Sequence, residues 1–246
     1  MKARHLKLAG ALMIVGAVLA NVGFILLGSR FDYPDILQRP AAEVLGRFEA
    51  DVAAIAALFL LLALGAALLI PIAWLTRQLV PAERPALRRF ALAAGVGAGI
   101  VQVIGLMRWP TLVPHLADVV TNASTSAAAR ADAISTFQTL HDVLGGLIGE
   151  TFGYALTAAW TIAMVVGVAG ERRPGRWFAP TGAAAALLIA TGLLIPLDVP
   201  GTDMANFVGY ILWSVWMIGF GVSLLRGGAT SDAVVRRPIA TPATAS

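Results

Sequence analysis

The chain has 246 residues, of which 58% are hydrophobic and 13% are charged, against about 25% charged residues in an ordinary soluble domain. Its apolar residues fall in runs of about 20, the length that crosses the hydrocarbon core of a bilayer. A soluble globular fold is therefore excluded, and an integral membrane protein is predicted. The absence of cysteine excludes disulfides, thiolate metal sites and a cysteine nucleophile. The basic residues behind the net charge of +4 flank the apolar runs, which is typical of membrane topology, so no nucleic-acid partner is expected.

The hydropathy pattern predicts an all-α polytopic membrane protein, a six-transmembrane-helix bundle with two long outer loops. The predicted spans are Leu8–Gly28, Val52–Thr76, Phe90–Trp109, Leu140–Ala169, Phe178–Leu197 and Met204–Leu225. The first is similar to a signal peptide as far as Ala20, but its apolar run continues to Gly28, so we predict a retained anchor. Residues 1–226 form the predicted transmembrane domain. The tail over 227–246 is rich in Ala, Thr, Ser and Pro, and we expect it to be disordered and cytoplasmic.

The basic residues predict the orientation of the bundle. With the N-terminus in the cytoplasm, 13 of the 18 lysines and arginines lie on the inner side. The positive-inside rule then predicts a multi-pass protein of the cell inner (plasma) membrane with both termini cytoplasmic. The inner connections are short, whereas the outer loops Ser29–Asp51 and Pro110–Thr139 are long, so a functional site is expected on the outer side.

The first outer loop contains FDYPDILQRPAAEVLGRFEAD, in which Ala41–Asp51 is predicted to be helical. Glu43 and Arg47 are four residues apart and are placed to pair on one helix face. Phe31 and Tyr33 are among the apolar side chains placed to dip into the membrane interface. We interpret this segment as an amphipathic lid that lies on the membrane.

The third span ends in GLMRWPTLVPHLADVV. Trp109 is expected at the level of the lipid headgroups, and Pro110 is expected to end the helix. Arg108 has two readings: its side chain snorkels outward to water, or it turns inward to a carboxylate. His115 follows in a short amphipathic segment.

The fourth span contains HDVLGGLIGETFGYALTAAW, in which Gly145, Gly149 and Gly153 form two overlapping GxxxG patterns. Such a stripe predicts close approach of a neighbouring helix. On an α-helix Glu150 lies about 40° from Gly146, at the border of this packed face, and about 14 Å below the start of the span. A charge at that depth costs about 2.5–3.5 kcal/mol on insertion scales, so Glu150 is expected to face the bundle interior.

Glu150 is read either as a site residue or as a packing carboxyl that is hydrogen-bonded within the bundle. The first reading predicts an outward-opening pocket that binds a small molecule or lipid. Its candidate residues are Glu150, Tyr154, Arg108, Gln102, Asn21, His141 and Tyr210. On an ideal α-helix His141 lies about 180° from Glu150, so these two are not expected to share one first-shell site.

Three segments together resemble the bacterial six-span DUF4386 family, a domain of unknown function. They are FDYPDILQRPAAEVLGRF, GLMRWPTLVPHLA and FQTLHDVLGGLIGETFGYALTAAWT. The resemblance covers residues 8–226 and is most specific in Arg–Trp–Pro at the end of the third span and in the His–Gly–Glu–Gly–Tyr run of the fourth. It implies the six-span architecture and assigns no role to any residue.

Three classes of function remain open. The first is a membrane protein that binds a small molecule or lipid, and the second is a structural or partner-binding subunit in which the glycines and the acid serve packing alone. The third is an intramembrane metal-dependent enzyme. Only His115, Asp118, His141 and Asp142 qualify as ligands for it, and their spacing matches no metal motif. No Walker loop or Gly-x-Ser-x-Gly elbow is present. We therefore predict no metal and no cofactor. The expected partners are the lipid bilayer and a small-molecule or lipid ligand, and the sequence does not indicate a protein partner.

Overall fold

The computed structural model describes residues 3–168 and 174–235. All secondary-structure elements in these ranges are helices, and turns and loops join them. Their bounds are α1 Ala3–Phe31, η1 Asp35–Gln38, α2 Ala41–Glu49, α3 Val52–Ala67, α4 Leu69–Thr76, η2 Arg77–Leu79, α5 Pro85–Thr111, α6 Val113–Thr121, α7 Ala127–Leu140, η3 His141–Phe152, α8 Gly153–Val168, α9 Phe178–Ala190, η4 Thr191–Leu197 and α10 Thr202–Val235. Six helical stretches in the described residues are long and apolar enough to cross a membrane. The chain is therefore a multi-pass, six-helix membrane protein.

The six spans form a closed ring in chain order. Each span packs against the spans before and after it, and α10 closes the ring by packing against α1. At that closing contact a Cβ atom on Gly221 would lie 2.6 Å from the Gly10 carbonyl oxygen, so the two backbones touch. Close backbone contact between small residues replaces, inside a bilayer, the hydrophobic driving force that packs helices in water.

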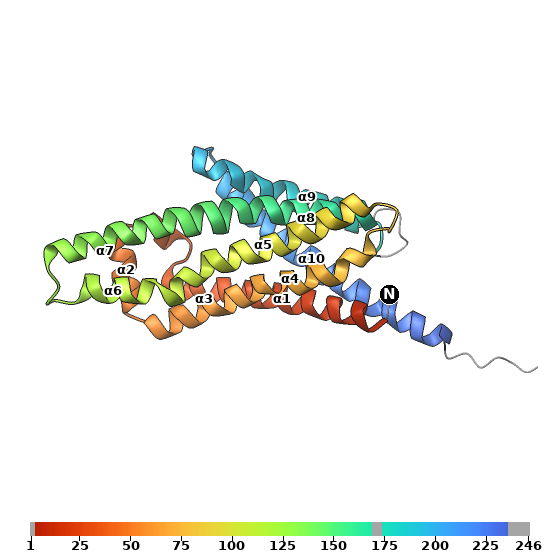
Figure 1. The fold of residues 1–246 in the computed structure, drawn as a ribbon, viewed down its shortest axis with the longest axis horizontal. Coiled ribbons are helices and arrows are strands. Elements are labelled where there is room, and N and C mark those ends of the chain that lie inside the picture. The colour runs from red at the N-terminus through yellow and green to blue at the C-terminus, as the bar shows by residue number, and fades with distance from the viewer. Residues whose placement is uncertain (1–2, 169–173, 236–246) are drawn as a thin grey trace, which may run out of the picture.

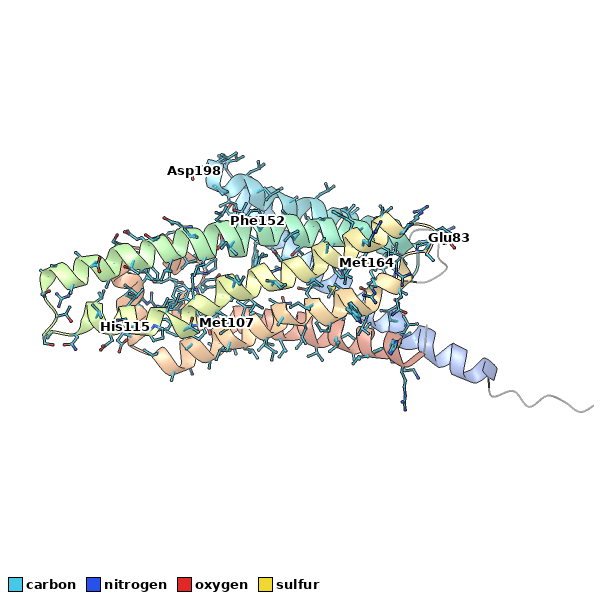
Figure 2. The ribbon with its side chains drawn as sticks, viewed as in Figure 1. Glu83, Met107, His115, Phe152, Met164 and Asp198 are labelled. Atoms are coloured by element: carbon cyan, nitrogen blue, oxygen red, sulfur yellow. The ribbon has the colours of Figure 1, made fainter. Side chains whose placement is uncertain are left out.

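The predicted second outer loop is mostly helix. The third span runs on through α6 to Thr121, and the fourth begins at Ala127 instead of Leu140, which makes them 37 and 42 residues long. At 1.5 Å per residue the longer one measures about 63 Å, roughly twice the hydrocarbon thickness. The α6–α7 hairpin therefore projects beyond the other helices, at the end opposite the N-terminus (Figure 1). The residues labelled in Figure 2 mark this axis, from His115 in the projecting part to Glu83 at the opposite end.

Pro110 does not end the third span, contrary to the prediction. It lies inside α5, which continues to Thr111, and α6 resumes at Val113 after a single intervening residue. The missing proline N–H removes one hydrogen bond, and the amphipathic α6 compensates by burying Val113, Leu116 and Ala117.

The first outer loop folds onto this hairpin. The predicted helix is present as α2, but its apolar face packs mainly against α6, so the reading of a lid lying on the membrane is wrong. Val44, Leu45 and Phe48 are buried by this contact. Arg47 pairs with Asp32 at 3.8 Å and not with Glu43. We call α2, α6 and α7 the outer cap.

An aromatic core joins the outer cap to the spans. Trp109 is fully buried there and not at headgroup level, since its ring stacks on Phe59 with centroids 4.6 Å apart. Phe31, Phe48 and Phe137 surround the same indole. These five rings come from α1, α2, α3, α5 and α7, so this one cluster fixes the cap on the bundle.

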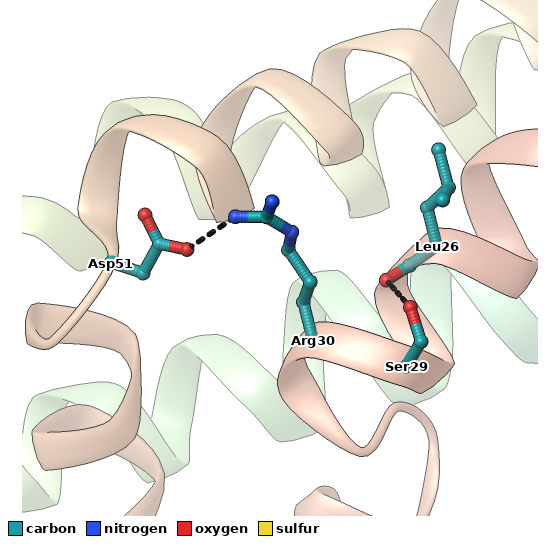
Figure 3. A network of polar contacts seen from close by, with 4 residues as sticks. All are labelled: Leu26, Ser29, Arg30 and Asp51. Atoms are coloured by element: carbon teal, nitrogen blue, oxygen red, sulfur yellow. Dashed lines mark hydrogen bonds and ion pairs between the residues drawn. The ribbon is translucent and has the colours of Figure 1, made fainter.

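A salt bridge at the surface closes the first outer loop at its base. Arg30 near the end of α1 donates to Asp51, the residue before α3, at 2.9 Å (Figure 3). Ser29 donates to the Leu26 carbonyl in the same turn. Both members of the ion pair are about half exposed, so the pair orients the loop and adds little stability.

The opposite half of the bundle has its own core around Trp160, Phe178, Trp216 and Phe220. The first residues of α1 and the last residues of α10 lie at this end (Figure 1). Helix α10 is described as far as Val235, so it passes the predicted start of the tail at residue 227; residues 236–246 lie outside the described residues. Which end is cytoplasmic stays a prediction.

Candidate functional site

The glycine stripe of the fourth span faces α5, residue by residue. A Cβ atom on Gly149 would lie 3.0 Å from the Gly105 Cα atom, and one on Gly153 would lie 3.1 Å from Gln102 Cγ. One on Gly145 would lie 2.6 Å from Nη2 of Arg108. The predicted close approach is therefore present, and its partner is the third span. Gly146 is different, since a Cβ atom there meets nothing closer than the His141 carbonyl oxygen at 4.0 Å.

The stretch that carries these glycines is a π-helix and not the α-helix assumed above. It spans His141–Phe152, and the Thr151 hydroxyl donates to the Gly146 carbonyl, five residues back, at 2.9 Å. Hydrogen bonds from i to i+5 widen each turn, so residues nine apart return to nearly the same face after about two turns. His141 and Glu150 are nine residues apart. The predicted angle of about 180° between them is therefore wrong.

Arg108 turns inward, as its second reading proposed, but in the described residues it forms no ion pair with a carboxylate. Its side chain is 4% exposed although it carries a full charge. The guanidinium donates from Nη1 to the Gly105 carbonyl, and its carbon lies 5.3 Å from the centroid of the Trp109 ring. Its Nε is buried and has no hydrogen-bond partner. The absence of a side chain at Gly145 leaves the space that the guanidinium occupies.

Glu150 is partly buried and interacts electrostatically with Arg108. It also acts on the phenols of Tyr33, Tyr154 and Tyr210. Within the described residues, however, no hydrogen bond or ion pair joins the Glu150 carboxylate directly to any of them. A buried cation and a carboxylate thus lie near each other without a direct contact. We call Arg108, Glu150, Tyr33, Tyr154 and Tyr210 the polar cluster.

Tyr33 is the member of the cluster that sequence reasoning missed. Helix α1 ends because Asp32 takes the left-handed φ of 58°, and this turn brings Tyr33 back toward the bundle. Its ring packs edge-on against Phe59 and Phe24. Burial, together with the negative charge of Glu150 and against the opposing effect of Arg108, raises the pKa of the Tyr33 phenol to about 12. The signal in the sequence was a tyrosine beside proline in an otherwise polar loop, which reads equally well as an interfacial anchor.

The similarity of this chain to known proteins shows its family. A family model described as Domain of unknown function (DUF4386) matches residues 8–221. The chain belongs to the DUF4386 family. No curated protein and no solved structure matches it. This match confirms the predicted family relationship and assigns no activity to the DUF4386 protein.

Of two other predicted residues of the DUF4386 protein, one is connected to the polar cluster and the other is not. Gln102 donates to the buried Thr157 hydroxyl at 3.1 Å, and Tyr210 interacts with the same hydroxyl, so Gln102 reaches the cluster through Thr157. Asn21 is bound elsewhere, since its amide nitrogen donates to the Ala17 carbonyl at 2.7 Å and to the Ser214 hydroxyl at 2.9 Å. The hydrogen bond to Ser214 joins α1 to α10.

His141 lies at the outer edge of the cluster and interacts electrostatically with Arg108 and Asp142. Its Nδ1 is buried and has no hydrogen-bond partner, and its ring stacks on Phe137 of the aromatic core. Among the described residues of the DUF4386 protein no group of three or more acidic or histidine side chains is placed to hold a metal ion.

Neither of two surface hollows in the described part of the DUF4386 protein is lined by a residue of the polar cluster. One lies between α4 and α5, and the other lies between α10 and residues 174–177, which precede α9. The outward-opening pocket predicted around Glu150 is therefore not one of these hollows.

Proposed function

We propose that this protein binds a small molecule with an anionic group at the polar cluster, between the outer cap and the spans. The observation that carries the proposal is the state of Arg108, a charge that is 4% exposed, has an unpartnered Nε and has no ion pair in the described residues. An uncompensated buried charge is costly, and guanidinium groups pair preferentially with carboxylate and phosphate groups.

The other members of the cluster suit a ligand of mixed polarity. The three tyrosines offer hydroxyl groups at the edge of apolar rings, and the Glu150 carboxylate supplies hydrogen-bond acceptors. Because Glu150 and Arg108 interact without direct contact, a bound molecule with an anionic group and a donor group would satisfy both at once.

The test is recovery of the bound molecule from purified protein. We expect mass spectrometry of extracts to find a small anionic molecule with the wild type and to find it reduced at least tenfold with Arg108→Gln. Arg130→Gln is the matched control, because Arg130 also has a buried unpartnered Nε but lies in α7 and donates to the Asn122 carbonyl. Equal recovery from both variants would refute the proposal.

A structural subunit is the second candidate, and one observation favours it. Arg108 already packs on Gly145 and donates to Gly105, which locks α5 to the fourth span. In that case no molecule is recovered from the wild type. Glu150→Gln then leaves every measured property except stability unchanged.

A further inference from the structure

The hollow between α4 and α5 lies in the half of the bundle that holds both termini. It has a volume of about 730 Å³ and is lined almost entirely by apolar groups. Pro71 and Trp74 line it from α4, and Ala93 and Val96 line it from α5, with Arg89 nearest the start of that helix. Trp74 is 54% exposed, so the hollow is open to whatever surrounds the bundle.

The local sequence explains why a hollow forms here. The second span is interrupted, because α3 ends at Ala67 and α4 begins at Leu69. Pro71 has no N–H to donate to the Ala67 carbonyl, so the helix does not continue with its full set of hydrogen bonds. On the opposite wall Ala93 contributes only a methyl group.

The end of the hollow carries positive charge. Arg89 lines it directly, and the guanidinium carbon of Arg77 lies 3.4 Å from the centroid of the Trp74 ring. Neither arginine forms an ion pair with an acidic side chain in the described residues. Two uncompensated guanidinium groups therefore lie beside an apolar hollow on the membrane-facing surface.

We propose that this hollow binds one anionic phospholipid, with an acyl chain between α4 and α5 and the headgroup phosphate between Arg77 and Arg89. A free anion would gain nothing from the apolar lining, and a neutral lipid would leave the two arginines without a partner. Basic side chains between membrane helices are a known means of holding anionic headgroups. This site is separate from the polar cluster, so either proposal can fail without the other.

The test compares the protein in nanodiscs of phosphatidylcholine with and without phosphatidylglycerol. Native mass spectrometry should show one retained phosphatidylglycerol on the wild type. The double variant Arg77→Gln/Arg89→Gln should bind it roughly tenfold more weakly or worse, because each basic residue contributes about 1 kcal/mol toward an anionic surface. Ala93→Phe should also displace it without changing any charge.

Arg226→Gln is the matched control. Arg226 lies in the same half of the bundle but lines the other hollow. We expect this variant to retain phosphatidylglycerol as the wild type does. The proposal would be overturned if the double variant retained phosphatidylglycerol or if the Arg226 variant lost it equally. Unchanged binding by Ala93→Phe would also overturn it, because no acyl chain would then lie in the apolar part of the hollow.

Discussion

At the scale of single residues, the main feature is a buried arginine whose space comes from a glycine on another helix. Arg108 fits because Gly145 has no side chain, and a Cβ atom there would lie 2.6 Å from Nη2. The sequence shows both residues but not their contact. It offers an arginine near a span end, for which snorkelling is as good a reading as burial. The inward orientation depends on the register between two helices, which one sequence does not contain.

Tyr33 provides a residue-scale prediction because its phenol has a raised pKa of about 12 against an ordinary value of 10.0. The folded state therefore favours the neutral phenol. The stability that this contributes is complete below pH 10.0 and is lost as the pH rises toward about 12. We expect the melting temperature of the wild type to fall more steeply over this range than that of Tyr33→Phe.

The near-ultraviolet tyrosinate absorbance gives a direct check of the same prediction. The chain has three tyrosines, so the difference between the titration curves of the wild type and Tyr33→Phe isolates one phenol. Its midpoint should lie near 12. A midpoint near 10.0 would show that Tyr33 is in water and away from Glu150.

At the scale of elements, the contact between α5 and η3 shows what a pattern predicts well and what it predicts poorly. The stripe of Gly145, Gly149 and Gly153 correctly indicated a close helix neighbour. The angles around the helix were wrong, because the same glycines lie in a π-helix over His141–Phe152. Hydrophobic periodicity cannot show this change, since an apolar span has no polar face whose period could shift.

The contact yields an element-scale prediction for Gly105→Ala. A Cβ atom on Gly105 would lie 2.7 Å from the Gly149 Cα atom and 2.9 Å from the Leu144 carbonyl oxygen. Both are backbone atoms, so one helix must move, and we expect a loss of about 1–3 kcal/mol, as for other overpacked sites. The measurement is unfolding in a single detergent by temperature and by denaturant.

Gly146→Ala is the control for that experiment. It adds the same methyl group to η3 but away from α5, since nothing lies closer to the new Cβ atom than the His141 carbonyl oxygen at 4.0 Å. We expect this variant to be as stable as the wild type or slightly more stable, because alanine restricts the unfolded chain. If both variants lose stability equally, the loss does not come from the contact between α5 and η3.

At the scale of the whole molecule, the six spans and their order follow from hydropathy alone, and the fifth span has the predicted bounds of Phe178–Leu197. Of the outer cap only α2 is predicted, because α6 and α7 lack the long apolar run of a membrane span and their sequence is typical of an outer loop. Their burial depends on the aromatic core, whose five rings lie far apart in the sequence. Contacts between residues so far apart in the sequence depend on the tertiary fold, which hydropathy does not determine.

The orientation of the bundle in the membrane gives a prediction for the whole molecule. Because the arginines gather at the connections on one side, reporter fusions after Arg84 and after Arg173 should be cytoplasmic, and a fusion at Thr125 should be external. Alkaline phosphatase and a fluorescent protein at each point give opposite readings and serve as controls for each other. A cytoplasmic Thr125 would reverse the bundle and place the polar cluster on the other side.

The projecting α6–α7 hairpin has a practical consequence for structure determination. A membrane protein of 25.6 kDa offers too little mass outside the detergent for particle alignment in electron cryomicroscopy. Here α6 and α7 project beyond the other helices, pack against each other and are joined only by residues 122–126. A soluble helical bundle inserted in place of that turn would continue both helices without a flexible linker. Because α7 is continuous with η3 and α8 to Val168, the inserted domain would serve as a rigid fiducial for the transmembrane region.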